Sequence, residues 1–176
     1  MGLWNGTSPV QDLDMASFRQ AMKVNLEANF RESSSQDESA RILTFVLVAY
    51  RATIPYLIEQ SNPHATWTLI TGGAGELGVA GVTAISQGAL FSLANVACLE
   101  NVKTNIRFNE VYLCYRVDFD SVAEKKGTAD RIKASDFARV YEGILANKDI
   151  DACRVSVLGP GDVDDLKYRK KLPKFK

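Results

Sequence analysis

The sequence predicts an α/β protein with a parallel sheet of about three strands flanked by helices. Three runs rich in β-branched and aromatic residues, 66–71, 105–113 and 151–158, are typical of strands. Segments with the apolar spacing of helices separate them, and this alternation favours a parallel sheet with right-handed crossovers. The first run leads through a glycine-rich turn into a long apolar segment ending at Glu100, which indicates strand, tight turn and helix.

The composition is that of a globular protein with one sizeable core. The chain has 176 residues, of which 46% are hydrophobic and 24% are charged. Its 21 basic and 21 acidic side chains balance, which excludes a general attraction to nucleic acid or to an anionic membrane. The sequence therefore predicts a single domain over residues 1–166, followed by a solvated basic tail over residues 167–176.

Cysteine spacing and hydropathy indicate neither export nor a metal site. Cys98, Cys114 and Cys153 are far apart and odd in number, which argues against a disulfide framework and against a Cys-x-x-Cys metal site. The N-terminus lacks the basic start and apolar core of a signal peptide. No apolar run approaches the roughly 18 residues of a membrane span. We therefore expect a cytoplasmic protein without a metal.

The N-terminal third is expected to hold two helices separated by a polar insertion. Turn-forming residues fill positions 1–10. A helix is predicted over about residues 15–30, capped by Asp14, because apolar side chains recur there at helical spacing: Phe18, Met22, Leu26 and Phe30. An inserted polar loop is expected over residues 31–45. Helical spacing resumes over 42–60, where Pro55 should kink or end the helix.

The later segments are predicted in the same way. Residues 118–130 are rich in charge and are expected to be a loop. Ser135 is expected to cap a helix through its hydroxyl group. The apolar stripe of that helix consists of Phe137, Val140, Tyr141 and Ile144. The only histidine, His64, precedes the first strand at the end away from the expected site, so we expect a surface turn residue there.

The glycine turn has two interpretations. Gly73, Gly75 and Gly78 form a Gly-x-Gly-x-x-Gly, the pattern that binds NAD or NADP phosphates between a strand and a helix. That motif requires an acidic residue about 20 positions later, closing a second strand, whereas the chain there is still helix-like. A dinucleotide-binding oxidoreductase that uses residues 71–78 is therefore one alternative.

Four motifs favour the other interpretation. They are Lys23-Val24-Asn25-Leu26, the strand 67–71, the helix with Gly88 to Ala94, Ala97 and Glu100, and Asn105-Ile106-Arg107-Phe108-Asn109. In this order and at nearly this spacing, they resemble the C-terminal half of the short-chain dehydrogenase/reductase family. The resemblance extends over about residues 10–157. It implies a truncated Rossmann-like fold that lacks the family's N-terminal cofactor-binding unit.

The resemblance also implies that hydride transfer is absent. Redox members use a serine after the strand and then a Tyr-x-x-x-Lys, in which the lysine lowers the pKa of the tyrosine and the serine holds the substrate oxygen. The tyrosine position is Thr83 here, the lysine position is Gln87, and the serine region is Thr71-Gly72. An alcohol without a neighbouring cation and a neutral amide cannot replace the phenol and the ammonium group. We therefore expect no cofactor.

The remaining polar residues predict an uncharged pocket above the strand ends. The candidate site residues are Asn25, Thr71, Gly72, Thr83, Gln87, Tyr112 and Tyr115. Asn25 matches the family's catalytic asparagine, or is simply a polar residue within a helix. Such a pocket can orient a small, largely apolar substrate and polarise its carbonyl group without a cofactor, as in cyclisation, isomerisation or dehydration. Alternatively, Thr83 and Gln87 are solvated helix positions of a protein that has lost its site.

Association between copies of the chain is also expected. A half-fold leaves a strand edge unpaired, and such edges tend to be paired or covered. In relatives, the helices matching residues 15–60 and 83–100 pack against a second subunit. The small residues Ala84, Gly88, Ala94 and Ala97 would permit a close approach there. A non-catalytic partner that docks through these helices is therefore an alternative function.

Overall fold

The computed structural model describes residues 12, 14–16, 19, 36–79, 82–127 and 129–172. Within these ranges, it describes residues 36–44 and 82 by their backbone alone. The chain divides into two units, Met1–Gln60 and Ser61–Lys176. The single domain predicted over residues 1–166 stays a prediction, and each unit is described by itself. None of the described helices is long and apolar enough to cross a membrane.

The first unit contains helix α2, Gln36–Glu59. Leu47, Tyr50 and Ile54 are buried at the three- and four-residue spacing of one helix face. The prediction of a polar loop over residues 31–45 is therefore wrong from Gln36 onward. The buried side chains later in α2 stabilise the whole helix, including its polar first turn. Pro55 lies inside α2 and does not end it, since the buried face outweighs the loss of one backbone hydrogen bond. Most of the helix predicted over residues 15–30 lies outside the described residues.

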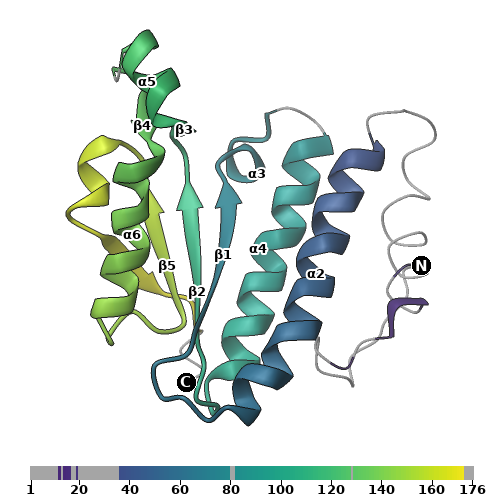
Figure 1. Ribbon diagram of the computed structural model, residues 1–176. Helices are drawn as coiled ribbons and strands as arrows, with labels where there is room; N and C mark the ends of the chain where they lie inside the picture. The colour runs from purple at the N-terminus through teal and green to yellow at the C-terminus, as the bar shows by residue number, and fades with distance from the viewer. Residues whose placement is uncertain are drawn as a thin grey trace. The chain divides into compact units, whose positions relative to one another are not determined.

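The second unit is built on a four-stranded sheet with the order β1-β2-β5-β6 (Figure 1). Strands β1 (Thr66–Gly72), β2 (Arg107–Leu113) and β5 (Cys153–Val157) are parallel, and they are the three predicted strands. The predicted α/β fold with a mostly parallel sheet is thus confirmed.

The fourth strand, β6 (Lys167–Lys170), runs antiparallel to β5. Its four side chains are exposed, but the predicted tail is a paired strand over these residues. Backbone pairing holds this segment on the sheet, and Lys170 Nζ donates hydrogen bonds to the carbonyl oxygens of Asp149 and Asp151, at 3.1 and 2.7 Å. The lysines that suggested a solvated tail therefore help to dock a strand.

Helix α4, Val82–Asn101, packs against the face of the sheet that carries Phe108 and Tyr112. Ala94 and Ala97 are fully buried in this layer. The association between copies of the chain through a small-residue face of α4 stays a prediction.

Helix α6, Ala134–Ala146, covers the opposite face, which carries Val111, Val155 and Val157. Phe137, Val140 and Ile144 of the predicted stripe are buried there. Side chains alternate between the two faces along a strand, so β2 contributes to both layers. The core of the second unit therefore lies on both sides of the sheet.

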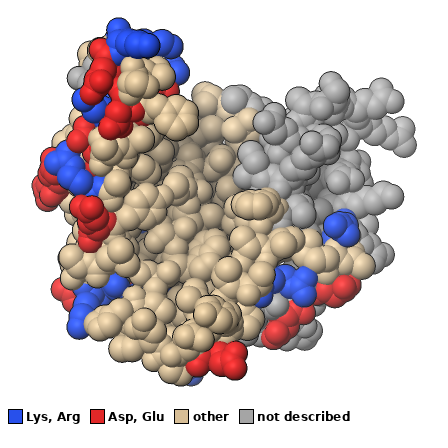
Figure 2. All heavy atoms as spheres, viewed as in Figure 1, with Lys and Arg blue, Asp and Glu red and all other residues tan. Residues whose placement is uncertain are grey.

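Strands β3 (Arg116–Asp118) and β4 (Arg131–Lys133) form a small parallel pair. In the chain they follow β2 and precede α6, and helix α5 (Asp120–Lys126) connects them. The loop predicted over residues 118–130 is therefore wrong. Ion pairs order the segment: Arg131 binds Asp118 at 2.8 Å and Asp130 at 2.7 Å. Figure 2 shows the charged side chains that gather over α5.

The two ends of α6 are held by side chains from elsewhere. Ser135 does not cap the helix through its hydroxyl group; its backbone N–H instead donates to Asp120 Oδ1 at 3.0 Å. At the other end, the guanidinium of Arg107 donates to four carbonyl oxygens at 2.9–3.2 Å, those of Ile144, Leu145, Asn147 and Ile150. A cation there also complements the helix dipole.

Candidate active site at the end of β1

The glycine turn, residues 72–78, joins β1 to α4 through the short helix α3, Ala74–Leu77. A Cβ atom on Gly73 would lie 2.5 Å from Cys114 Sγ, and one on Gly75 would lie 2.7 Å from a ring carbon of Phe91. Gly78 ends α3 with a φ of 66°, in the left-handed region that favours glycine. Protein side chains fill the space beside Gly73 and Gly75. The turn therefore requires glycine at these two positions for close packing.

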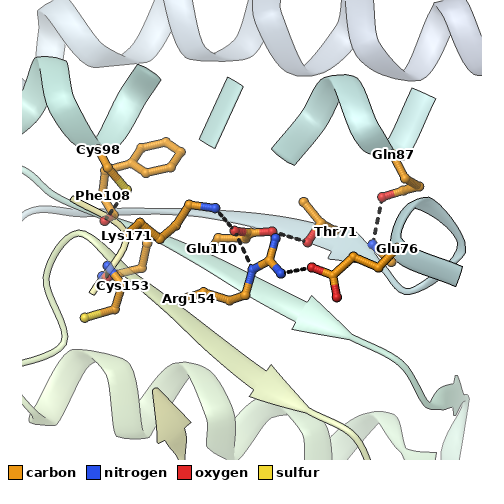
Figure 3. Close-up of polar contacts among 11 residues, drawn as sticks. Thr71, Glu76, Gln87, Cys98, Phe108, Glu110, Cys153, Arg154 and Lys171 are labelled. Atoms are coloured by element: carbon orange, nitrogen blue, oxygen red, sulfur yellow. Dashed lines mark hydrogen bonds and ion pairs between the residues drawn. The ribbon is translucent and has the colours of Figure 1, made fainter. Parts of the chain in front are cut away.

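Gln87 of α4 reaches back to the end of β1 (Figure 3). The backbone N–H of Gly72 donates a hydrogen bond to Gln87 Oε1 at 2.7 Å. Because Oε1 must be the acceptor in this contact, the orientation of the amide group is fixed. Gln87 Nε2 therefore presents only N–H donors to any neighbouring group.

A buried ion-pair network, which we define as Glu76, Glu110, Arg154 and Lys171, lies beneath this turn. The carboxylate of Glu110 is 0% exposed and accepts hydrogen bonds from Thr71 Oγ1 at 2.7 Å and from Arg154 Nε at 3.0 Å. The ammonium group of Lys171 also binds it. Three donors thus satisfy a buried charge that would otherwise be costly. Charged side chains therefore lie beside Thr71, a residue predicted to line an uncharged pocket.

The guanidinium of Arg154 connects the interior with the turn. It lies 4.7 Å from the ring centroids of both Phe91 and Tyr112, so its charge interacts with two aromatic rings. One nitrogen binds buried Glu110, and another binds Glu76 on α3, whose side chain is 46% exposed. Arg154 therefore fixes a half-exposed carboxylate from below.

The contacts around Glu76 lower its pKa, whereas those around Tyr112 raise the pKa of the phenol. The hydrogen bond from Arg154 lowers the pKa of Glu76 below its ordinary value. Burial raises the pKa of the Tyr112 hydroxyl, and hydrogen bonds with Cys114 and Glu76 raise it further. At neutral pH, Glu76 is therefore a carboxylate and Tyr112 a protonated phenol.

The comparison with known proteins agrees with the motifs in the sequence. The chain is 43% identical over 167 residues to the "Short-chain dehydrogenase/reductase iacG" of Pestalotiopsis fici (strain W106-1 / CGMCC3.15140). The aligned stretch covers 94% of this chain and 60% of that relative. The chain is a partial, C-terminal-type match to the short-chain dehydrogenases/reductases. The predicted resemblance is thus confirmed.

The fold agrees with that relationship. A mostly parallel sheet flanked by helices is what a Rossmann-like fragment of a short-chain dehydrogenase/reductase would form. No protein-family model matches the chain, and no solved structure matches it significantly.

Four of the predicted site residues come together. Thr71, Gly72, Gln87 and Tyr112 lie at the carboxyl ends of β1 and β2 or reach them from α4. Thr83 is in the first turn of α4 and is exposed, and its carbonyl oxygen accepts a hydrogen bond from the Ser86 hydroxyl at 2.9 Å.

The other predicted site residues lie elsewhere. Tyr115 makes its contacts away from Gln87: its hydroxyl donates to the carbonyl oxygen of Ala129 at 2.7 Å, and its ring packs against the core under α6. The chain has left β2 before Tyr115, so the strand no longer directs its side chain. His64 is exposed in a turn before β1, as predicted. Asn25 lies outside the described residues.

Sequence reasoning missed Glu76, Glu110, Arg154 and Lys171. A signal was present in two of them, because Glu110 and Arg154 are opposite charges in the middle of apolar strand runs. They prove to be direct neighbours in the register of β2 and β5. Among the described residues, no group of three His, Cys, Asp or Glu side chains could hold a metal ion.

Proposed function

We propose that this site transfers protons on a small carbonyl compound and passes no hydride. The reaction class is isomerisation, cyclisation or dehydration of a largely apolar substrate, without a nicotinamide cofactor. The observation that carries the proposal is the 2.7 Å hydrogen bond from the Gly72 N–H to Gln87 Oε1. It turns the amide Nε2 into an oriented, neutral hydrogen-bond donor.

An amide donor suits this chemistry better than it suits hydride transfer. In redox relatives, the lysine at this position lowers the pKa of a tyrosine so that the phenol can pass a proton. Gln87 carries no charge, and the exposed Thr83 has no acidic proton near neutral pH. A fixed N–H donor still stabilises the negative charge that develops on a carbonyl oxygen during enolisation, because it needs no reorganisation.

The surroundings favour an apolar substrate. Leu77 and Val79, at the end of the glycine turn, are 70% and 52% exposed. Exposed apolar side chains beside fixed polar groups are typical of sites that bind small organic ligands. The substrate in this proposal is therefore an apolar molecule with at least one carbonyl group.

Hydrogen exchange on a carbonyl probe tests the proposal without knowledge of the natural substrate. The protein is incubated in D₂O with ethyl acetoacetate, and proton NMR follows the replacement of the hydrogens between the two carbonyl groups. We expect faster exchange with the protein than in buffer, and a loss of about 10-fold or more in Gln87→Ala. The matched control is Ser92→Ala, an exposed position farther along α4, which should exchange at the wild-type rate.

A second candidate function is a non-catalytic module that self-associates through its helices. Val96 and Leu99 of α4 are 40% and 52% exposed, and Phe45 and Tyr56 of α2 are 74% and 60% exposed. Such side chains favour burial against a second copy of the chain. Light scattering measures the oligomeric state of the wild type, Val96→Glu and Leu99→Glu. A wild-type dimer that dissociates in both variants supports self-association. If the dissociated variants still exchange hydrogen at the wild-type rate, association and catalysis are separate properties.

The third candidate is an NAD(P)-binding oxidoreductase that uses Gly73, Gly75 and Gly78. The name of the similar protein from Pestalotiopsis fici supports it, since it describes a dehydrogenase/reductase. The close packing of Gly73 and Gly75 speaks against it. Titration with NADPH and NADH separates the candidates, because binding in the micromolar range would favour the oxidoreductase.

A further inference from the structure

We propose that Glu76 is the proton-accepting base of this site, that Arg154 is its positioning residue, and that the substrate is a 1,3-dicarbonyl compound. This inference rests on the proposed proton-transfer function. It adds to it the identity of the base and the chemical class of the substrate.

The first support is the contrast in exposure along the network. The side chain of Glu110 is 0% exposed, that of Arg154 is 8% exposed, and that of Glu76 is 46% exposed. An ion pair that only stabilised the core would not need its last carboxylate to reach solvent. Glu76 is thus the member of the network that a substrate can contact.

The second support is how firmly Glu76 is held. Its partner Arg154 lies over the rings of Phe91 and Tyr112, 4.7 Å from each centroid. Arg154 is also bound to Glu110, which Thr71 and Lys171 hold in turn (Figure 3). A carboxylate anchored in this way loses little freedom when a substrate binds. Pre-positioning of this kind is what a general base requires.

The third support is the proximity of the turn to Gln87. A Cβ atom on Gly75 would lie 2.9 Å from Gln87 Cβ, so the backbone of α3 is in close contact with α4 at this point. Glu76 is the next residue in the chain. The side chains of Glu76 and Gln87 therefore start from backbone positions that lie close together. A base and an oxyanion donor that act on adjacent substrate atoms need such an arrangement.

The proton transfer balances without an oxidant or a reductant. The carboxylate of Glu76 takes a proton from the carbon between two carbonyl groups, and the electron pair of the broken C–H bond moves into an enolate. An N–H of Gln87 Nε2 donates a hydrogen bond to the enolate oxygen. Return of the proton from Glu76 to another carbon or to oxygen completes an isomerisation and restores the carboxylate.

The substrate class follows from the strength of the base. The ion pair with Arg154 stabilises the charged form of Glu76, so the carboxylate is ionised at neutral pH but is a weak base. Proton transfer is efficient when the acidities of donor and acceptor are not far apart. A C–H group between two carbonyls is far more acidic than one beside a single ketone. A 1,3-dicarbonyl compound therefore fits, and a simple ketone does not.

The test compares hydrogen exchange on two probes, ethyl acetoacetate and butan-2-one, in D₂O by proton NMR. We expect the wild-type protein to accelerate exchange of the first probe only. Glu76→Gln should lose about 10²-fold or more of that rate, whereas Glu76→Asp should retain part of it. The matched control is Glu124→Gln on α5, a carboxylate 62% exposed and paired with Lys133, which should behave as wild type.

Arg154→Lys tests the positioning role through a measurement that a purely structural role would not change. Loss of the guanidinium hydrogen bond should move the pH at which the exchange rate rises to a higher value, because that bond is the largest cause of the lowered pKa of Glu76. Circular dichroism checks that each variant is folded. An unchanged pH profile in folded Arg154→Lys would overturn the positioning role.

The outcomes separate this inference from the proposed function. If folded Glu76→Gln exchanges ethyl acetoacetate at the wild-type rate while Gln87→Ala does not, Glu76 is not the base and the proposed function stands. Equal acceleration of both probes would overturn the assigned substrate class. If wild-type protein accelerates neither probe, the proposed function and this inference both fail.

Discussion

Arg154 Nε lies 3.0 Å from Glu110 Oε2, with side chains that are 8% and 0% exposed. Transfer of two charges from water into a protein interior costs several kcal/mol each, and only well-placed partners offset that cost. Thr71 and Lys171 supply further donors to Glu110, and Glu76 accepts from Arg154. The pair therefore links the centre of the sheet to the glycine turn, where the candidate site lies.

Loss of the central carboxylate should be costly. Glu110→Gln leaves the cations of Arg154 and Lys171 without their shared buried partner. We expect the free energy of unfolding to fall by about 3–5 kcal/mol, measured by denaturant titration. In the control Glu124→Gln, which breaks an exposed pair with Lys133, the loss should be about 0–1 kcal/mol. Equal losses in the two variants would contradict a stabilising network.

The glycine turn should be sensitive to a single methyl group. Gly75→Ala would place a Cβ atom 2.7 Å from the Phe91 ring and 2.9 Å from Gln87 Cβ, so we expect a loss of about 1–3 kcal/mol. Gly88→Ala is the matched control in α4, because nothing lies within 4 Å of its added Cβ. Thermal unfolding should show the control unchanged or stabilised by up to about 1 kcal/mol. A tolerated Gly75→Ala would contradict the packing interpretation of the turn.

The strand residue Arg107 should stabilise α6. Its guanidinium donates to four carbonyl oxygens in the last turn of that helix and the loop that follows it, and Arg107→Ala leaves them to water. We expect a loss of about 1.5–3 kcal/mol by denaturant unfolding, the range for hydrogen bonds from a charged group. Arg116→Ala, at a side chain that is 57% exposed, should lose about 0–1 kcal/mol. The account of α6 fails if both variants lose the same amount.

Acidification should remove the contribution of Glu76. Its pKa is lower in the folded protein than the ordinary value of 4.5, because Arg154 donates to it. The stabilisation is therefore fully present above the pKa of the unfolded chain, and is lost as the pH falls through the lower folded value. Unfolding of wild type and Glu76→Gln, followed from neutral pH to below 4.5, should show the stability difference shrinking. A difference that stays constant with pH would exclude this linkage.

The parts of the fold that depend on local pattern could be predicted. β1, β2 and β5 are apolar, β-branched runs, and the stripe Phe137, Val140 and Ile144 identified α6. A buried strand or helix beside a turn is recognisable from the apolar and turn-forming residues within a short stretch of sequence. These elements could therefore be predicted from the local sequence alone.

Contacts between distant residues could not be predicted. Glu110 and Arg154 are 44 positions apart, and the Asp120 carboxylate that binds the start of α6 is 15 positions from Ser135. Only the strand register brings the first pair together, and only the small β3–β4 sheet brings the second. Resemblance to a family identified Gln87 as a site position, but its bond to the Gly72 N–H depends on how α4 packs.

One time course tests the central claim that the site transfers protons and not hydride. The protein is mixed with ethyl acetoacetate and NADPH in D₂O, while proton NMR follows deuterium entry and absorbance follows the cofactor. We predict that deuterium enters the carbon between the carbonyls faster than in buffer, with NADPH unchanged. Consumption of NADPH together with reduction of the ketone, or exchange no faster than in buffer, would contradict the claim.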